Sequence, residues 1–587
     1  MNFNFTKTSI LAVALFTAGF SVCSAKSANL SKITMKDWQY NAEKNVYYKT
    51  GISYAANPKA PEYESMGIFV PGNYFTAKKQ KDGNYSVKVN AGGKTGNWTA
   101  KNAPYVMPIE TPGYMALNPP TEFSDTVSTY TDAGFIFVWA GARGRNHGAP
   151  AGVTDFKAAI RFTRFNKSLL PGDTARFFTF GMSGGGAQSA ILGASGDSDL
   201  YTPYLKQIGA VMTESDAVLG CMAWCPITNL DVANEAYEWN MGAARNGISD
   251  FECTLSNQMA EKFAEYINEL NLKDDEGNAL LLEKSVSGIY QSGSYYEWIK
   301  KIIEDSLNDF LKNTKFPYVS SAPAAHMEML AGGGGFGMGM GLPPKNAGAK
   351  PAPEGMPKGA PEGIPKENKN PPNFEERDNI ARNDAKGTVQ LSGIYRNPKD
   401  YVDALNANGV WVLYDEDANE AKITSVADFA KAFKVPTKTV GAFDSLNASQ
   451  GENTLFGYGD GNGAHFDCIM AGLLRGTEYE KDYSDDLAKL DSEGKSVQSR
   501  LDAYNPMYFI SGYYEGYKTS KVAPFWRIRT GIFQGDTAVS TEANLSQALK
   551  NYGAQVDFAT VWGLYHVEAE TSGTATQNFI DWVSSCL

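Results

Sequence analysis

The stretch from Arg176 to Ala190 reads RFFTFGMSGGGAQSA, and it decides the fold. An apolar run that favours a strand leads into Gly181-Met-Ser183-Gly-Gly185, and a helix-forming run follows. A strand that turns sharply into a helix strains the residue at the turn and requires neighbours without side chains. The glycines around Ser183 meet this requirement. The pattern predicts a nucleophile elbow that exposes Ser183 Oγ, although a structural glycine loop is the alternative for so short a motif.

The residues around this elbow favour the same interpretation. An amphipathic segment over 155–165, with Thr154 as its expected N-cap, leads through the turn Leu170-Pro-Gly-Asp173 into the strand. The order helix, turn, strand, elbow and helix is that of an α/β hydrolase. Apolar strands alternate with helices up to about residue 229 and reappear after 505, which predicts a mostly parallel sheet covered on both faces. We therefore predict an α/β-hydrolase fold with a large inserted lid domain.

The expected domain boundaries follow from these changes in pattern. We expect a signal peptide over 1–25, the first part of the hydrolase core over 26–229, the inserted lid over 230–504 and the second part of the core over 505–587. Within the lid, residues 331–373 contain GGGGFGMGMG and the near-repeat APEGMPKG and APEGIPK. Glycine raises the entropy cost of ordering and proline removes donors, so this segment is expected to be a disordered linker.

The N-terminal segment predicts export. Lys7 precedes an apolar stretch over 10–22, and Cys23-Ser-Ala25 supplies small residues for cleavage after Ala25. Phe-Ser-Val before Cys23 is a poor lipobox, so a lipoprotein anchor there is disfavoured. The apolar stretch is too short to span a membrane, and no later segment predicts an integral membrane helix in the mature chain. We expect a periplasmic or secreted protein.

The net charge and the cysteine content limit the classes of partner and metal that we expect. The net charge of −12 disfavours nucleic acid and anionic membranes, because both carry phosphate, and favours a small neutral or phenolic substrate. No metal or cofactor is expected, because the close pair of cysteines in GCMAWCPI lacks a second pair of ligands nearby. The expected mature chain has an odd number of cysteines: Cys221, Cys225, Cys253, Cys468 and Cys586. The sequence does not determine which of them form disulfides, and it does not determine the oligomeric state.

A serine nucleophile needs a base, and the chain offers only four histidines: His147, His326, His465 and His566. α/β hydrolases place the histidine on a loop after the last strand, where only His566 in VWGLYHVEAE fits. We predict that His566 is the base. The other three are expected to be structural or peripheral, although His465 could reach a substrate from the lid.

The acid and the oxyanion hole are expected in two further loops. WRIRTGIFQGDTAV places Asp536 after the penultimate strand, where it would accept a hydrogen bond from the histidine, or else cap a helix over 537–549. The amide of Gly184 is the expected first oxyanion donor. Gly113 in MPIETPGYM would supply the second, with an ordinary type II turn as the alternative.

The chain resembles the bacterial subtype B tannases, serine esterases that cleave galloyl esters. The resemblance covers nearly all of the mature chain apart from the Gly/Pro-rich insert, and its motifs occur in the same order: AGARGR, DFKAAIRF, LPGDTAR, SAILGASG, CPITNLDVANEAYEW, KTVGAFDSLNASQGENTLFG, WRIRTG and FIDWVSSC. It implies Ser183 as nucleophile, His566 as base and the amides of Gly113 and Gly184 as the oxyanion hole.

The same resemblance implies that Lys438, Glu452 and Asp536 bind the galloyl ring. One ammonium and two carboxylates can satisfy three adjacent hydroxyls, and a phenol without them would leave buried charges unpaired. Taken without the resemblance, Lys438 and Glu452 look like ordinary surface charges.

One position departs from the family pattern. The family's triad acid lies two residues before the ring-binding aspartate, and this chain has Gln534 there. A glutamine can accept from the histidine through its carbonyl or donate to it through its amide, and the second arrangement fixes the wrong tautomer. Asp536 is the expected acid, with Glu568 or Glu570 from the histidine loop as a further alternative.

The expected function is hydrolysis of galloyl esters of tannins through an acyl-serine intermediate by a secreted serine esterase. Two alternatives stay open. The first is an esterase for feruloyl, hydroxycinnamoyl or other phenolic esters, and the second is a catalytically weakened homologue that binds polyphenols.

Overall fold

A computed structural model describes residues 30–285, 289–320, 389, 391, 393–434, 436 and 438–587. The expected signal peptide over 1–25, the expected linker over 331–373 and His326 lie outside the described residues. Within the described ranges, no helix combines the length and apolar character needed to cross a membrane.

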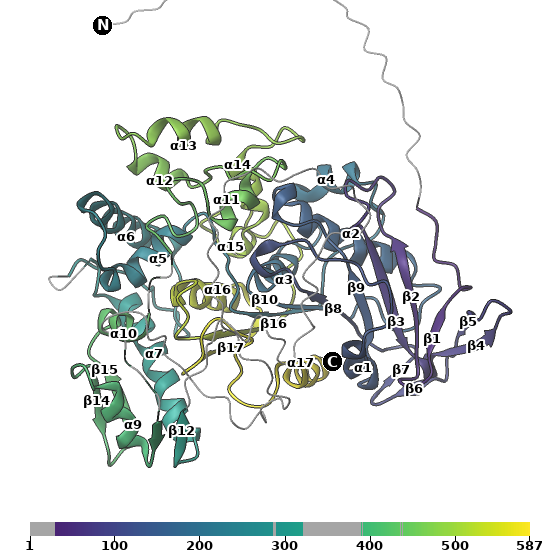
Figure 1. Ribbon diagram of the computed structural model, residues 1–587, viewed down its shortest axis with the longest axis horizontal. Coiled ribbons are helices and arrows are strands. Elements are labelled where there is room, and N and C mark those ends of the chain that lie inside the picture. Colours follow the sequence, from purple (N-terminus) through teal and green to yellow (C-terminus); the bar gives the residue numbers. More distant parts are fainter. Residues whose placement is uncertain are drawn as a thin grey trace, which may run out of the picture.

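A nine-stranded sheet forms the centre of the molecule (Figure 1). Its strands lie in the order β1 (Gln39–Asn41), β2 (Val46–Ser53), β3 (Ser65–Pro71), β9 (Ile136–Ala140), β8 (Tyr105–Ile109), β10 (Phe177–Met182), β11 (Gly220–Trp224), β16 (Phe525–Gly531) and β17 (Gln555–Val561). The strands from β9 to β17 are parallel, and β1, β2 and β3 pair antiparallel. The mostly parallel sheet predicted from the apolar pattern is therefore present.

Consecutive side chains of β10 contact different helices, and these contacts show that helices cover both faces of the sheet. Phe180 contacts Phe579 of α17 (Ala575–Ser585) with ring centroids 4.2 Å apart, and Tyr130 of α1 (Asp125–Asp132) at 5.4 Å. Thr179, the residue before it, hydrogen-bonds Ser189 of α3 (Gly184–Ala194) at 3.0 Å. Successive side chains of a strand point to opposite faces, so α1 and α17 cover one face and α3 the other.

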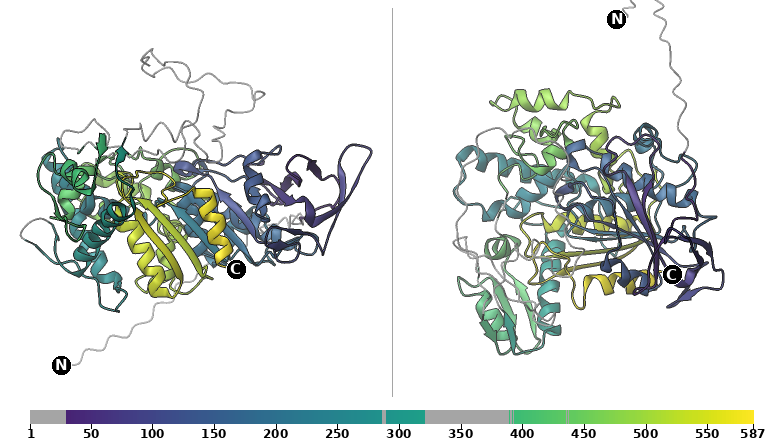
Figure 2. Two further views of the ribbon diagram at one scale, coloured as in Figure 1. Left: turned by 90° about the horizontal axis from the view of Figure 1, so that it is seen from below. Right: turned by 45° about the vertical axis from the view of Figure 1, so that its right-hand side comes forward.

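Two more helices complete this cover, α2 (Ala151–Phe165) and α16 (Val539–Tyr552). Figure 2 shows α16 and α17, in yellow, on opposite sides of β16 and β17. The expected N-cap at Thr154 is wrong. α2 begins at Ala151, and Thr154 is buried one turn inside it, where its hydroxyl donates to the Pro150 carbonyl at 3.0 Å.

The chain between β11 and β16 is mainly helical; in Figure 1 its first helices lie to the left of the sheet and its later helices lie above it. Its elements are α5 (Ala233–Met241), α6 (Asp250–Leu270), α7 (Ser294–Asn313), β12 (Tyr318–Ser320), β13 (Gly393–Tyr395), α9 (Pro398–Leu405), β14 (Val412–Asp415), β15 (Glu420–Ile423), α10 (Val426–Phe433), α11 (Gly451–Phe456), α12 (Cys468–Leu473), α13 (Glu480–Leu487), α14 (Val497–Ala503) and α15 (Pro506–Ile510). The segment expected to form the lid, 230–504, contains all of these except α15.

Smaller elements lie between the strands in the part of the chain before β11. These are the hairpin strands β4 (Phe75–Lys79), β5 (Tyr85–Val89), β6 (Lys94–Thr95) and β7 (Trp98–Thr99), the 3-10 helix η2 (Pro112–Tyr114) and the short helix α4 (Thr202–Gln207). Of these, η2 matters for the site, because it follows β8 and lies against α11 and the start of α3.

Candidate active site

Ser183 occupies a strained turn between β10 and α3. Its backbone has φ 60° and ψ −125°, outside the region that side-chain-bearing residues favour. The adjacent glycines are required by close approach to β8: a Cβ on Gly185 would lie 1.9 Å from the Ile109 carbonyl oxygen, and one on Gly181 2.6 Å from it. These contacts seat the N-terminus of α3 on the sheet and fix the position of the serine.

His566 follows β17 and contacts the serine. Its Nε2 lies 2.7 Å from Ser183 Oγ, and its Nδ1 lies 2.6 Å from Gln534 Oε1. A carbonyl oxygen can only accept, so Nδ1 carries the proton and Nε2 is free to accept from the serine hydroxyl. The two side chains are 5% and 8% exposed, which keeps this hydrogen-bonded row away from bulk water.

The amide nitrogen of the Gln534 side chain, which faces away from His566, is also hydrogen-bonded. Its Nε2 donates to Thr530 Oγ1 at 2.6 Å and to Glu542 Oε1 at 2.8 Å. The Gln534 backbone carbonyl accepts from Lys434 Nζ at 2.9 Å. Burial raises the pKa of Glu542 to about 8 and lowers the pKa of Lys434 to about 8, because the interior disfavours both charges.

The expectation that Asp536 is the partner of His566 is corrected by this geometry. The chain turns at once after β16, with Phe533 N–H bonded to the Leu564 carbonyl at 3.0 Å, and residue 534 then points inward. Asp536 is partly exposed two residues later, and no hydrogen bond among the described residues joins it to His566. It is not a helix cap either, since the N-cap residue of α16 is Ala538.

The other acidic alternative on the histidine loop is engaged elsewhere. Glu570 accepts from Trp224 Nε1 at 2.9 Å and from Arg527 Nη2 at 2.7 Å. Glu568 lies near Glu110, whose pKa is raised to about 8 by burial and by this second carboxylate. Gln534 is therefore the side chain that the structure brings to His566 Nδ1.

The two expected oxyanion donors lie side by side. A Cβ on Gly184 would be 3.2 Å from the Gly113 nitrogen, so the backbones of η2 and α3 meet at these residues. Gly113 has φ 55°, a conformation that glycine adopts readily, and its carbonyl accepts from Arg145 Nη1 at 3.0 Å. Gly184 is the first residue of α3, where a backbone N–H has no partner within the helix. This arrangement can present two N–H groups beside Ser183.

Lys438 and Glu452 form a pair next to this hole. Lys438 Nζ lies 3.6 Å from Glu452 Oε2 and 3.9 Å from the centre of the Phe443 ring. Glu452 is only 6% exposed and lies on α11, which packs on η2. The preceding residue, Gly451, lies close to the Arg145 guanidinium that binds the Gly113 carbonyl. Both side chains are therefore held in place rather than lying free on the surface.

Asp536 is connected to the same pair through α5. Tyr237 Oη donates to the carbonyl of Gly535 at 2.8 Å. The Tyr237 ring lies edge-on to Phe443 at 6.1 Å, and Phe443 lies beneath Lys438. The three residues expected to bind the ring are therefore linked through two aromatic side chains.

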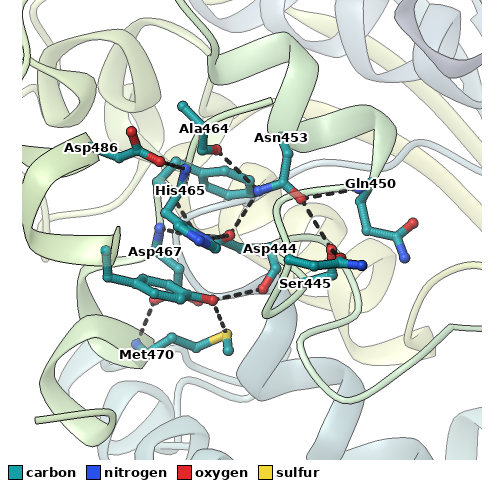
Figure 3. A network of polar contacts seen from close by, with 12 residues as sticks. Asp444, Ser445, Gln450, Asn453, Ala464, His465, Asp467, Met470 and Asp486 are labelled. Carbon is teal, nitrogen blue, oxygen red and sulfur yellow. Dashed lines mark hydrogen bonds and ion pairs between the residues drawn. The ribbon is translucent and has the colours of Figure 1, made fainter. Parts of the chain in front are cut away.

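A buried polar network lies behind α11 (Figure 3). His465 Nδ1 lies 2.7 Å from Asp444 Oδ1, and Asn453 Nδ2 donates to the same oxygen at 2.7 Å. The His465 ring stacks on Tyr483 with centroids 3.7 Å apart. His465 is 3% exposed, which identifies it as a structural residue that anchors the segment carrying Glu452.

The remaining sequence candidates lie apart from this row. The ring of His147 lies edge-on to Tyr63 at 6.2 Å. The five cysteines within the described residues are unbridged, and Cys221 and Cys225 are buried. No group of three or more His, Cys, Asp or Glu side chains in the described ranges is arranged to hold a metal ion.

Sequence reasoning missed Thr530, Glu542 and Lys434. Thr530 lies inside β16, within the motif WRIRTG, but had no expected role, and Glu542 inside a helix and Lys434 at a helix end belong to no motif named above. The available signal was that Glu542 is the one charged residue in the stretch TAVSTEANLSQAL.

Comparison with known proteins agrees with the fold. The BD-FAE family model matches residues 97–268. Comparison with curated protein sequences gives no match. Among solved structures, Fusobacterium nucleatum tannase is 24% identical with a TM-score of 0.65, covering 94% of this chain and 97% of its own.

Two other solved structures are similar to a comparable degree. The native tannin acyl hydrolase from Lactobacillus plantarum is 22% identical, with a TM-score of 0.61 over 92% of this chain and 94% of its own. A tannin acyl hydrolase in complex with ethyl gallate is 23% identical, with a TM-score of 0.61 over 92% and 94%. The expected α/β-hydrolase fold is confirmed, and the resemblance to tannases holds in three dimensions.

Proposed function

We propose that this chain is a secreted serine esterase that hydrolyses galloyl esters of tannins through an acyl-serine intermediate. The row Ser183, His566 and Gln534 carries the proposal, because it joins a strained nucleophile to a base of defined tautomer. The likeness to a tannin acyl hydrolase bound to ethyl gallate supports the choice of ester.

The proposed reaction begins with proton transfer from Ser183 Oγ to His566 Nε2 as the oxygen attacks the ester carbonyl. Negative charge then develops on the carbonyl oxygen, where the amides of Gly113 and Gly184 would stabilise it. The imidazolium returns the proton to the leaving alcohol, and the carbonyl re-forms as an acyl-serine. A water molecule attacks this ester by the same route, with His566 as base, and releases the acid.

Recognition of the ring would fall to Lys438, Glu452 and Asp536. The carboxylates accept from ring hydroxyls and the ammonium donates to a hydroxyl oxygen, so three adjacent hydroxyls satisfy all three groups. A feruloyl ring carries one hydroxyl and one methoxy group and has no third oxygen, so it would leave a buried carboxylate without a donor. Such a loss is typically worth several orders of magnitude in selectivity, roughly 10⁴ where the site is fully desolvated.

Paired turnover assays test both parts of the proposal. Methyl gallate should be hydrolysed much faster than methyl ferulate, and a fluorophosphonate probe should label Ser183 in the folded protein. Labelling together with preference for ferulate would support an esterase for other phenolic esters. Absence of labelling and of turnover of any ester would leave a polyphenol-binding role and refute the proposed activity.

Export is proposed on the N-terminal sequence alone. Expression of the full chain should yield a mature protein beginning after Ala25 in the periplasm or medium, which N-terminal sequencing tests. Retention of the segment up to Ala25 in the cytoplasm would contradict it.

A further inference from the structure

We propose that Glu542 is a positioning residue for this reaction: with Thr530, it holds the Gln534 amide so that the carbonyl oxygen faces His566. Gln534 in this orientation takes the place of a triad carboxylate. The inference rests on the proposed serine-esterase function and concerns how its histidine is kept in the active tautomer.

The orientation of the amide decides whether His566 can act as base. With Oε1 towards the ring, Nδ1 keeps its proton and Nε2 accepts from Ser183. With the amide reversed, an N–H group would face Nδ1 and move the ring proton to Nε2, which could then no longer accept from the serine. The wrong tautomer in a serine protease costs about 10⁴ in kcat.

Two acceptors on the far side of Gln534 select the productive orientation. Glu542 Oε1 and Thr530 Oγ1 both lie within 2.8 Å of Gln534 Nε2. Thr530 Oγ1 in turn lies 3.3 Å from Glu542 Oε1, so the hydroxyl proton points to the carboxyl and its oxygen is left to accept from Gln534. A reversed amide would set its oxygen against both of these oxygens and lose two hydrogen bonds.

The ionised carboxyl group enforces this selection, because a carboxylate oxygen can only accept. In the neutral group, Oε1 still accepts from both Gln534 and Thr530 when the proton is on Oε2, which is buried without a hydrogen-bond partner among the described residues. A proton on Oε1 would instead let the carboxyl group donate to a reversed amide, so the selection should weaken as Glu542 takes up a proton.

Glu542 also lies near the buried Lys434 ammonium, which favours the ionised carboxyl group, but its hydrogen bonds are made elsewhere. The side chain is fully buried and forms no ion pair within 4.0 Å among the described residues. A buried carboxyl group costs stability unless its hydrogen bonds repay it. In the described contacts those bonds all go to the residue that orients His566 and to the threonine beside it.

Variants that remove the Glu542 carboxyl group, or exchange it with the Gln534 amide group, test the proposal. Glu542→Leu removes the acceptor and should lower kcat by roughly 10- to 100-fold with KM little changed. Glu542→Gln, nearly isosteric, allows both amide orientations and should also lower kcat. Combining Gln534→Glu with Glu542→Gln moves the carboxylate against His566 and keeps the hydrogen bond between the two positions, so kcat should return to the wild-type value or exceed it.

Asn544→Leu provides the matched control for loss of a buried polar group from α16. Asn544 is buried on the same helix, two residues after Glu542. Its side-chain oxygen accepts from Tyr295 Oη at 2.8 Å, and no hydrogen bond among the described residues joins it to Gln534. It should lower the melting temperature as Glu542→Leu does but leave kcat unchanged. Equal loss of kcat in both variants, or no recovery in the folded double variant, would overturn the proposal.

A readout independent of turnover separates this inference from the proposed function. The chain has four histidines, so selective ¹⁵N labelling resolves the His566 ring by nuclear magnetic resonance. The wild type should show a protonated Nδ1 and an unprotonated Nε2, and Glu542→Leu should show a mixture. An unchanged tautomer in Glu542→Leu would overturn the inference, whereas inactivity towards every ester with the tautomer shift intact would refute only the proposed activity.

Discussion

Ser183 has a strained backbone, and its hydroxyl group is hydrogen-bonded to His566. Its dihedral angles cost stability that a glycine in the same place would not lose. Ser183→Gly should therefore raise the free energy of unfolding by about 1–3 kcal/mol while abolishing esterase activity. Chemical denaturation and an aryl acetate assay on the same samples check both effects.

Loss of the base should be as severe as loss of the nucleophile. His566→Ala should lower kcat by roughly 10⁴-fold or more without unfolding the protein, because the ring acts in the chemical step. His147→Ala, a histidine outside the hydrogen-bonded row, is the control and should retain the chemical step. Near wild-type activity in a folded His566→Ala protein would remove it as base.

Asp536 should affect substrate recognition and not proton transfer. Because Gln534 occupies His566 Nδ1, Asp536→Asn should mainly raise KM for gallate esters, by roughly 10- to 100-fold, and spare simple aryl acetates. Kinetics on both substrate types measure the difference. Loss of kcat on aryl acetates would restore Asp536 as the acid.

The elbow between β10 and α3 depends on glycine at each close contact. Gly185→Ala would force a Cβ to within 1.9 Å of the Ile109 backbone, which cannot be relieved by a side-chain movement. Overpacking of this kind should lower the free energy of unfolding by about 3 kcal/mol or more. Gly472→Ala in α12, where nothing lies within 4 Å of the added atom, is the control and should be neutral or stabilising.

Elements with a strong local pattern were predictable from the sequence, and the triad acid was not. The elbow and the last two strands, β16 and β17, follow from apolar runs bounded by turns, and the structure has them. The partner of His566 depends on the loop after β16, whose direction is set by the hydrogen bond from Phe533 N–H to the Leu564 carbonyl in the loop after β17. No local pattern carries that information.

The positions of Lys438 and Glu452 in the site also could not be predicted from a local sequence pattern. Considered alone they look like surface charges, and only the packing of α11 on η2 brings Glu452 to the oxyanion loop. The resemblance to a family supplied their expected role, and the structure supplies their proximity to each other.

Stability of the whole molecule should depend on pH through the acidic residues behind α11. Burial and the neighbouring Asp467 raise the pKa of Glu235, and burial together with Asp444 raises the pKa of Asp467 to about 7. The folded protein therefore binds protons more tightly than the unfolded chain, in which such groups titrate near 4. Stability should fall as the pH rises from about 4 through 7, and should level off only once both carboxyl groups have lost their protons in the folded protein.

Glu235→Gln tests this dependence. The variant lacks one ionisation, so its melting temperature relative to wild type should be higher at pH 8 than at pH 4.5. Thermal unfolding at the two pH values measures the difference. An equal shift at both would show that the carboxyl groups titrate normally in the folded protein.

The pairing of β11 with β16 has a consequence for synthesis of the chain. Gly220 of β11 pairs with Phe525 of β16, so the edge of a fully buried strand stays open while the intervening residues are made. Such an edge invites pairing with other chains and calls for protection until its partner emerges. Ser183 meets His566 across 383 positions, and the catalytic row can assemble only after β17 has joined the sheet. Under the proposed function, the nascent polypeptide should therefore be inert towards esters during nearly all of its translation, and hydrolytic competence should arise as one of the last events of folding.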